Sequence, residues 1–126
     1  MICLPSDAEG GKATPIGHLK LITKAPWLEE WRSTTLGITL AAQYQDKGYG
    51  SEAINWALDW AFNYGGLRRV EIGSVSFNER ASRLYEKLGF RQEGRLQEVV
   101  FNNGKWHDVL EFAMLKREWK VLRGLK

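Results

Sequence analysis

The stretch at residues 36–62 constrains this chain more than any other, because it joins a β-rich segment to a helical pattern through a glycine loop. At its centre lies the hexapeptide QDKGYG, residues 45–50, with glycines two residues apart. Glycine reaches positive φ at little cost and lets a ligand approach the backbone closely. The amides of such a turn, at the start of a helix, form a concave group of N–H donors backed by the positive end of the helix dipole. The loop is therefore predicted to bind a phosphate group.

Two common glycine fingerprints do not describe this loop. The P-loop pattern G-x-x-x-x-G-K-[ST] and the dinucleotide pattern G-x-G-x-x-G are both absent from the sequence. The spacing that is present is Q-x-x-G-x-G, between a predicted strand at 34–41 and a predicted helix at 51–64. Apolar residues at helical spacing indicate that helix: Ala53, Ile54, Ala57, Leu58 and Ala61.

Periodicity along the rest of the chain predicts further strands and one more helix. Alternation predicts strands at 15–22 and 69–77, and the order strand, helix, strand implies a parallel pair joined by a right-handed crossover. Asn78 is predicted to cap a helix that stops at Gly89. A hairpin is predicted to follow, turning at Asn102-Asn103-Gly104. Residues 116–126 are predicted to be a basic tail with a frayed helix.

Composition is that of one globular domain. The chain has 126 residues, of which 44% are hydrophobic and 26% charged. No apolar run approaches the roughly 20 residues of a membrane span, so we expect no membrane partner. The single cysteine, Cys3, cannot form an internal disulfide, and the N-terminal residues do not read as a secretory signal. We therefore expect a cytoplasmic, intracellular protein.

Nucleic acid and metal are not expected as ligands. The net charge is +3, but the basic residues are scattered and form no helix-turn-helix, zinc-finger or RNP-like pattern. His18 and His107 lie far apart in the sequence, with no cysteine or second histidine at ligand spacing. The mild positive charge suits an anionic cofactor equally well.

A second motif gives the glycine loop a family context. The sequence NERASRLYEKLGF, from Asn78 to Phe90, fits the pattern N-x-x-A/S-x-x-x-Y-x-x-x-G-F. Together with Q-x-x-G-x-G, in this order and separation, it resembles the GNAT superfamily of acyl-coenzyme A-dependent N-acyltransferases. The later hairpin, with Gly94, Gly104 and Trp106, is similar to the branch that acetylates ribosomal-protein N-termini and small amines. The resemblance covers about residues 16–115.

The resemblance implies an α/β (α+β) fold in one domain, residues 1–126, with a core at about 16–115. It implies a mixed, mostly antiparallel sheet with a central, parallel, splayed pair of strands and two helices. GNAT domains open with a strand and two helices, which we expect to be missing here. The chain is then a fragment, borrows that surface from a partner, or has an open acceptor cleft. Uncovered apolar sheet would favour a homodimer.

The resemblance also implies acetyl-CoA as co-substrate, without a metal. The strand before the loop would pair its backbone with the pantetheine arm, and the splay would admit the thioester. The loop amides would hold the pyrophosphate, and an asparagine would bond the pantetheine or acetyl end. The residues expected to bind acetyl-CoA are Ile38, Thr39, Leu40, Gln45, Asp46, Lys47, Gly48, Tyr49, Gly50, Ser51 and Asn78.

Tyr85 is the catalytic acid that the resemblance implies, although its place on an apolar helical face would also suit a core residue. Direct attack by an uncharged amine needs a base, a backbone N–H for the oxyanion and a proton for the leaving thiolate. Gly73 and Thr35 stand where relatives carry acidic residues, so Glu71, on the same strand face as Gly73, is predicted to act through water. Other potential contacts with the amine are His107 and Asp108.

The predicted function is therefore N-acetyl transfer from acetyl-CoA to a primary amine, in a ternary complex. The acceptor would be a protein N-terminus or a small amine. The alternative is a truncated GNAT-like module that binds coenzyme A or dimerises, with little or no turnover.

Overall fold

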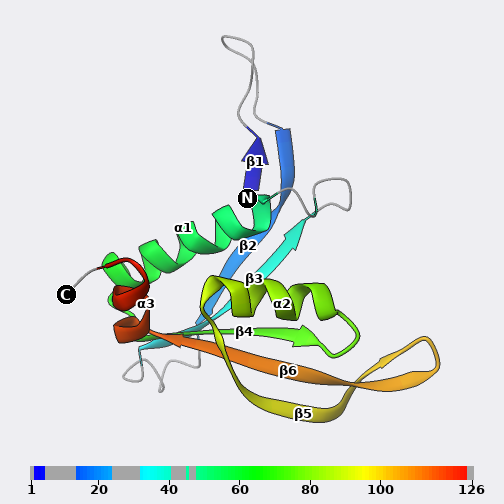
Figure 1. The fold of residues 1–126 in the computed structure, drawn as a ribbon. Helices are drawn as coiled ribbons and strands as arrows, with labels where there is room; N and C mark the ends of the chain where they lie inside the picture. Colours follow the sequence, from blue (N-terminus) through cyan, green and yellow to red (C-terminus); the bar gives the residue numbers. More distant parts are fainter. Residues whose placement is uncertain (1, 5–13, 24–31, 41–44, 46–47, 125–126) are drawn as a thin grey trace.

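The computed structural model describes residues 2–4, 14–23, 32–40, 45 and 48–124. They form one sheet with three helices (Figure 1). The elements are β1 (Ile2–Leu4), β2 (Thr14–Thr23), β3 (Ser33–Leu40), α1 (Tyr49–Asn63), β4 (Arg69–Val75), α2 (Glu79–Leu88), β5 (Arg91–Asn102), β6 (Lys105–Leu115) and α3 (Lys116–Leu122).

The sheet has the mixed topology that the sequence predicts. Its strand order is β1-β2-β3-β4-β6-β5, and each neighbouring pair is antiparallel except β3 and β4. That parallel pairing runs from Ser33 opposite Arg69 to Leu36 opposite Ile72. Beyond this point β3 continues to Leu40 and β4 to Val75, and the two strands diverge (Figure 1). The central splay is thereby confirmed.

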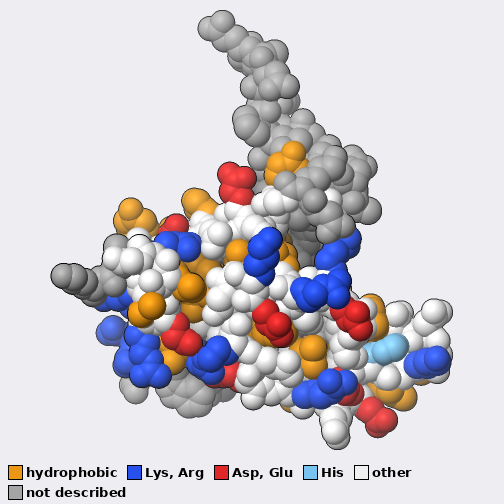
Figure 2. All heavy atoms as spheres, viewed as in Figure 1, with side chains coloured by type: hydrophobic (Ala, Val, Ile, Leu, Met, Phe, Trp, Pro, Cys, Tyr) orange, Lys and Arg blue, Asp and Glu red, His pale blue; other side chains and the backbone are white. Residues whose placement is uncertain are grey.

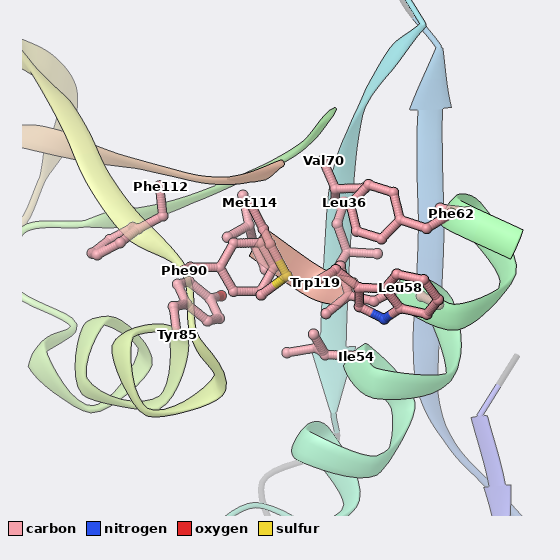
Figure 3. Packing of buried hydrophobic residues seen from close by; sticks show 13 residues of the cluster. Leu36, Ile54, Leu58, Phe62, Val70, Tyr85, Phe90, Phe112, Met114 and Trp119 are labelled. Carbon is pink, nitrogen blue, oxygen red and sulfur yellow. The ribbon is translucent and has the colours of Figure 1, made fainter. Parts of the chain in front are cut away.

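All three described helices pack on one face of the sheet. Leu36, Ile72 and Phe112, which are opposite one another in neighbouring strands, are buried on this face. Ile54, Leu58 and Phe62 of α1 pack against them, as does Trp119 of α3. Figure 3 shows the rings of Tyr85, Phe90 and Phe112 on one side of Met114 and the α1 side chains on the other. On the opposite face, no helix covers the sheet in the part of the chain that the structure describes.

The ends of α2 are fixed by the residues that the sequence indicates. Asn78 accepts a hydrogen bond on Oδ1 from the amide of Ala81, at 3.2 Å. At the other end Gly89 has a φ of 107°, and the amide of Phe90 donates to the carbonyl of Tyr85 at 3.0 Å. This is the Schellman arrangement, in which glycine takes the left-handed position without steric cost. The predicted cap and stop of this helix are both confirmed.

The β5–β6 hairpin turns as its sequence predicts. Asn103 and Gly104 have φ values of 56° and 76°, the pair of positive angles that a two-residue type I′ turn requires. A bulge interrupts β5 near Glu98, which has a φ of 51°. Asp108 accepts a hydrogen bond of 2.8 Å from the Glu98 amide, and it forms an ion pair with Arg95.

The C-terminal segment is more ordered than a basic tail. Residues 116–122 form α3, and Trp119 within it is only 2% exposed. The first turn is held by Glu118, which accepts from the Leu115 amide at 2.9 Å and pairs with Arg91. The hydrophobic core therefore extends past residue 115, where the sequence-based boundary was placed.

Candidate functional site

A cavity of about 350 Å³ lies between the N-terminal part of α1 and the length of α2. The glycine loop and α1 form one wall, the residues from Asn78 onward form the other, and Ile38 of β3 adds to the lining. Seven of the residues predicted from the sequence are brought together here: Ile38, Gln45, Gly48, Gly50, Ser51, Asn78 and Tyr85. Asp46 and Lys47 lie outside the described residues.

The glycine loop leads into α1 through Gly48, whose backbone has a left-handed conformation. Gly48 has a φ of 85° and accepts on its carbonyl a hydrogen bond of 3.1 Å from the amide of Glu52. A Cβ built at Gly48 would meet nothing within 4 Å, so backbone strain and not lack of space favours glycine here. The Arg80 guanidinium donates a hydrogen bond to Oε1 of Gln45, which ties the loop to α2. Tyr49 begins the helix, where N–H groups of the first turn lack carbonyl partners within the helix.

The charge around this cavity is positive. Arg80, Arg83 and Lys87 of α2 contribute to its lining, and none of the described residues that line it is acidic. Outside the lining, Glu79 pairs with Arg83, with its Oε2 at 3.8 Å from the guanidinium and both side chains exposed. Figure 2 shows Lys and Arg side chains gathered over and beside α2. A cavity with helix N-termini and these cations suits an anionic ligand.

A second cavity, of about 280 Å³, occupies the splay between β3 and β4. It begins where the parallel pairing ends, at Leu36 and Ile72. Its lining also includes Gly37 and Gly73, and two residues of β2 that the sequence analysis did not single out, His18 and Lys20. Ile38 and Tyr85 line both this cavity and the first, so the two cavities meet at these side chains.

Tyr85 combines the properties of a core residue and of an acid. It is 6% exposed, and its ring lies edge-on to Phe112 with the centroids 5.7 Å apart. Burial raises the pKa of its phenol above the usual value, because desolvation disfavours the phenolate. The side chain is therefore protonated at neutral pH, as a general acid must be before it reacts.

The last residues of β3, which are predicted to pair with the pantetheine arm, have one backbone edge that faces the splay. Thr39 and Leu40 are paired on one side with His18 and Gly17 of β2. On their other side the β3–β4 ladder has already ended at Leu36. A bound extended chain could thus add hydrogen bonds to this edge. Asn78, by contrast, already uses its side-chain oxygen to cap α2.

Glu71 is not brought together with Tyr85. It lies on the sheet face away from the helices, where Arg69 donates a hydrogen bond of 2.8 Å from Nε to its Oε1. Arg69 also forms an ion pair with Glu93 of β5, which lowers the pKa of that carboxyl. Glu71 lines a third cavity, of about 240 Å³, together with Thr35 and Glu111. This cavity shares Ile72 and Gly73 with the splay cavity.

The other two potential amine contacts lie elsewhere. His107 packs edge-on against Phe77, with ring centroids 4.8 Å apart, and neither it nor Asp108 lines any of the three cavities. The pKa of the Asp108 carboxyl is lowered, first by the hydrogen bond from the Glu98 amide and then by Arg95. These residues support the hairpin.

His18 and Lys20 are the site residues that sequence reasoning missed. The alternation of residues 15–22 predicts that both side chains lie on the same face of a strand, and this pattern could have indicated that they act together. Which residues they face depends on the register of β2 with β3, where His18 is opposite Thr39 and Lys20 is opposite Gly37. Among the described residues, no group of three or more His, Cys, Asp or Glu could hold a metal ion.

Comparisons with known proteins agree with this geometry. Residues 1–91 match the model of the family described as Acetyltransferase (GNAT) domain. The spermidine N(1)-acetyltransferase of Vibrio cholerae is 35% identical over 88 residues, which are 70% of this chain and 51% of that protein. YdaF of Bacillus subtilis, named as a proposed ribosomal N-acetyltransferase, is 32% identical over 89 residues, 71% of this chain and 49% of its own. The chain spans about half the length of these curated relatives.

Solved structures show the same similarity. The spermidine/spermine N-acetyltransferase SpeG from Vibrio cholerae, in complex with manganese ions, superposes with a TM-score of 0.76 at 33% identity. The match covers 88% of this chain and 62% of that one. A dodecameric structure of the Vibrio cholerae enzyme has a TM-score of 0.76 at 34% identity, and covers 82% of this chain and 59% of that one. No described helix is long and apolar enough to cross a membrane.

Proposed function

We propose, because the chain belongs to the GNAT acetyltransferase family, that it transfers an acetyl group from acetyl-CoA to a primary amine. One observation carries the proposal: a basic cavity between the start of α1 and the length of α2 meets, at Ile38 and Tyr85, a second cavity in the splay of the sheet. The first cavity suits the phosphates of the co-substrate. The second suits its thioester end and the incoming amine.

The assignment of the acetyl-CoA site follows these two cavities. The amides at residues 45–51 would hold the pyrophosphate at the start of α1, where donors and helix dipole act together. Arg83 and Lys87 would add positive charge along the groove. The backbone of residues 38–40 would pair with the pantetheine arm, and Asn78, at the start of α2, would bond the pantetheine or acetyl end.

The chemistry needs an acid and a base but no covalent intermediate. The uncharged amine attacks the thioester carbon, the C–S bond breaks, and Tyr85 donates its proton to the leaving sulfur. A backbone N–H at the splay would stabilise the oxyanion that forms at the carbonyl oxygen. The sequence predicts Glu71 as the base, acting through water from the neighbouring cavity, but Arg69 already engages its carboxylate.

For the acceptor amine and for the oligomeric state we propose a class, not a single species. Relatives are named for spermidine and, in one case, for ribosomal substrates, so polyamines and free α-amines are the acceptors to be tried first. A homodimer is proposed because the described sheet has one face without a helix, and uncovered sheet favours association. We place the protein in the cytoplasm, which its single cysteine supports.

The alternative is a module that binds coenzyme A or dimerises without efficient turnover. The two hypotheses agree on co-substrate binding and differ in turnover.

The test begins with calorimetric titration of the purified chain with acetyl-CoA and with coenzyme A. Binding is expected, and Gly50→Trp should abolish it because the indole would fill the space between the start of α1 and α2. The variant's circular dichroism spectrum and thermal transition show whether it is folded. Binding followed by acetylation of spermidine or of a peptide α-amine supports the enzyme. Binding without turnover supports the alternative, and a folded chain that binds neither ligand contradicts both.

A further inference from the structure

We propose that His18 is the base that removes the proton from the acceptor amine, an inference that rests on the acetyl transfer proposed above. The splay cavity is where that amine must meet the thioester. Of the residues that line this cavity, three carry titratable side chains, His18, Lys20 and Tyr85. The question is which of them can accept a proton at neutral pH.

Ordinary pKa values separate the three groups. A lysine ammonium, with a pKa of about 10.4, and a phenol, with a pKa of about 10, are both protonated at pH 7 and cannot act as bases there. An imidazole, with a pKa of about 6.5, is largely neutral at pH 7 and can accept a proton. His18 is therefore the group of this cavity whose chemistry fits.

His18 and Tyr85 reach the splay cavity from opposite faces of the sheet. Leu19 and Leu21 of β2 pack against the core, on the helical face. Because successive side chains of a strand point to opposite faces, His18 projects from the other face. Tyr85 comes from α2, on the helical face, and both side chains line the same cavity. The acid thus stands on the face where the basic groove lies, and the base on the face that no described helix covers.

Glu71 is less well placed for the same task. Its carboxylate accepts a hydrogen bond from Arg69 at 2.8 Å, and it lines the third cavity, in which Tyr85 takes no part. Part of the hydrogen-bonding capacity of this carboxylate is therefore already used by the guanidinium. His18 lies in the cavity that Tyr85 lines, at the point where the β3–β4 ladder has ended.

The titratable groups that share the cavity with His18 are Lys20 and Tyr85, and further groups line the cavity beside it. On its own strand Lys20 lies two residues away on the same face. Strand β3, which packs beside it, carries no charged residue in the sequence STTLGITL. Arg69 and Glu71 of β4 and Glu93 of β5 line the neighbouring third cavity, which shares Ile72 and Gly73 with that of His18. Lys20 would oppose a positive charge on the acceptor in this cavity, which favours an uncharged amine.

The proton balance closes with these two residues. His18 takes one proton from the ammonium form of the acceptor, which leaves a lone pair on nitrogen. That lone pair forms the C–N bond, and the C–S bond breaks as Tyr85 gives its proton to sulfur. The new amide nitrogen then returns a proton to the Tyr85 phenolate. The proton on His18 passes to solvent, so the sum is one amide, one thiol and one released proton.

The experiment compares His18→Gln with His107→Gln, which replaces the other histidine, at the hairpin and outside all three cavities. The acceptor is whichever of spermidine or a tripeptide α-amine the unmodified chain acetylates. We expect His18→Gln to lower kcat about 100-fold, the scale of general base catalysis, and to remove the acidic limb of the pH profile of kcat/KM. We expect His107→Gln to keep both, and both variants to keep the affinity for acetyl-CoA.

Other outcomes identify what has failed. A wild-type pH profile in His18→Gln overturns the inference, and loss of the acidic limb in Glu71→Gln would assign the base to Glu71. Absence of turnover in the unmodified chain would count against the proposed function. In that case NMR gives an independent readout, because the two imidazole C2–H resonances are assigned by the two variants. The resonance of His18, and not that of His107, should shift when acetyl-CoA binds; an unmoved resonance overturns its place in the cavity.

Discussion

The indole Nε1 of Trp119 donates a hydrogen bond of 3.0 Å to Oδ1 of Asp59, which joins α3 to α1. The Trp119 ring also packs against Phe62, with ring centroids 5.4 Å apart. Arg123 adds hydrogen bonds of 3.1 Å to Asp59 and to Asn55. The C-terminal helix is thus part of the packed domain, and it covers the end of α1 that lies away from the glycine loop.

Trp119→Ala is expected to destabilise the fold by about 3–5 kcal/mol, the usual cost of deleting a buried large aromatic side chain. The measurement is the free energy of unfolding from a denaturant titration. Trp56→Ala is the matched control, because Trp56 is 63% exposed and lies on the outer side of α1. Exposed substitutions usually change stability by about 0.5 kcal/mol or less. Equal stability of the two variants would contradict the packing described for α3.

Tyr85→Phe should lower kcat by roughly 100-fold, the scale of losing a general acid, and leave the affinity for acetyl-CoA unchanged. The variant keeps the ring that packs on Phe112 and Phe90, so the fold should persist. Tyr64→Phe, at a side chain that is 81% exposed, serves as the control. Steady-state kinetics and calorimetry separate the two effects. Unchanged turnover in Tyr85→Phe would leave this phenol a core residue only.

The pH dependence of Tyr85 follows from the direction of its shift. Burial raises the pKa of the phenol in the folded chain, so the acid stays protonated as pH rises through neutrality. The rate is expected to show no alkaline fall from this group until pH exceeds about 10, the ordinary tyrosine pKa. Above that value the unfolded chain loses the proton first, and stability should decrease with pH. Spectrophotometric titration, with Tyr85→Phe as reference, should show this phenol ionising at higher pH than a free tyrosine.

Arg83→Gln and Lys87→Gln should each weaken acetyl-CoA binding several-fold, because a single charge near a phosphate contributes about 1 kcal/mol. The loss should shrink as salt is added, since exposed charges are screened over about 8–10 Å at ionic strengths of 0.1–0.15 M. Lys105→Gln, at the far hairpin turn, is the control. Affinities that do not depend on salt in the unmodified chain would argue against a phosphate site along α2.

Asp108 should make the β5 bulge sensitive to acid. The Glu98 amide, and then Arg95, lower the pKa of its carboxyl in the folded chain. A depressed pKa means that the stabilising contribution is present above the ordinary value of about 3.9 and is lost as pH falls through the folded value. Hydrogen exchange of the Glu98 amide should therefore speed up in Asp108→Asn. Exchange at the unmodified rate in that variant would mean that the bulge is held by other contacts.

Local sequence signals predicted the parts of this structure that local chemistry determines. The Asn78 cap, the stop at Gly89 and the turn at Asn103-Gly104 depend on a few neighbouring residues, and each is present. The order of elements around the glycine loop likewise fixed the parallel pair and its crossover, because few connections of that kind are sterically allowed.

The remainder depends on contacts between distant residues. Trp119 donates a hydrogen bond to Asp59, which lies sixty residues earlier in the chain. The basic sequence around Trp119 does not indicate this contact and by itself predicts only a tail. The sequence indicated which face of its strand Glu71 lies on. It did not indicate that Arg69, which also binds Glu93 of β5, donates a hydrogen bond to the Glu71 carboxylate. His18 could be recognised as a site residue only once the register of β2 and β3 had placed it at the splay.

The end of the β3–β4 ladder at Leu36 and Ile72 has a consequence for thermal behaviour. A sheet whose central seam stops after four residue pairs has backbone groups there that a ligand lying along β3 would complete. Anything that binds only the folded state stabilises it by mass action, by about 2.7 kcal/mol at a hundred times its dissociation constant. The melting temperature should therefore rise with acetyl-CoA concentration. Under such linkage the fraction of folded chain near its melting temperature would report the concentration of acetyl-CoA, apart from any acetylation that the chain performs.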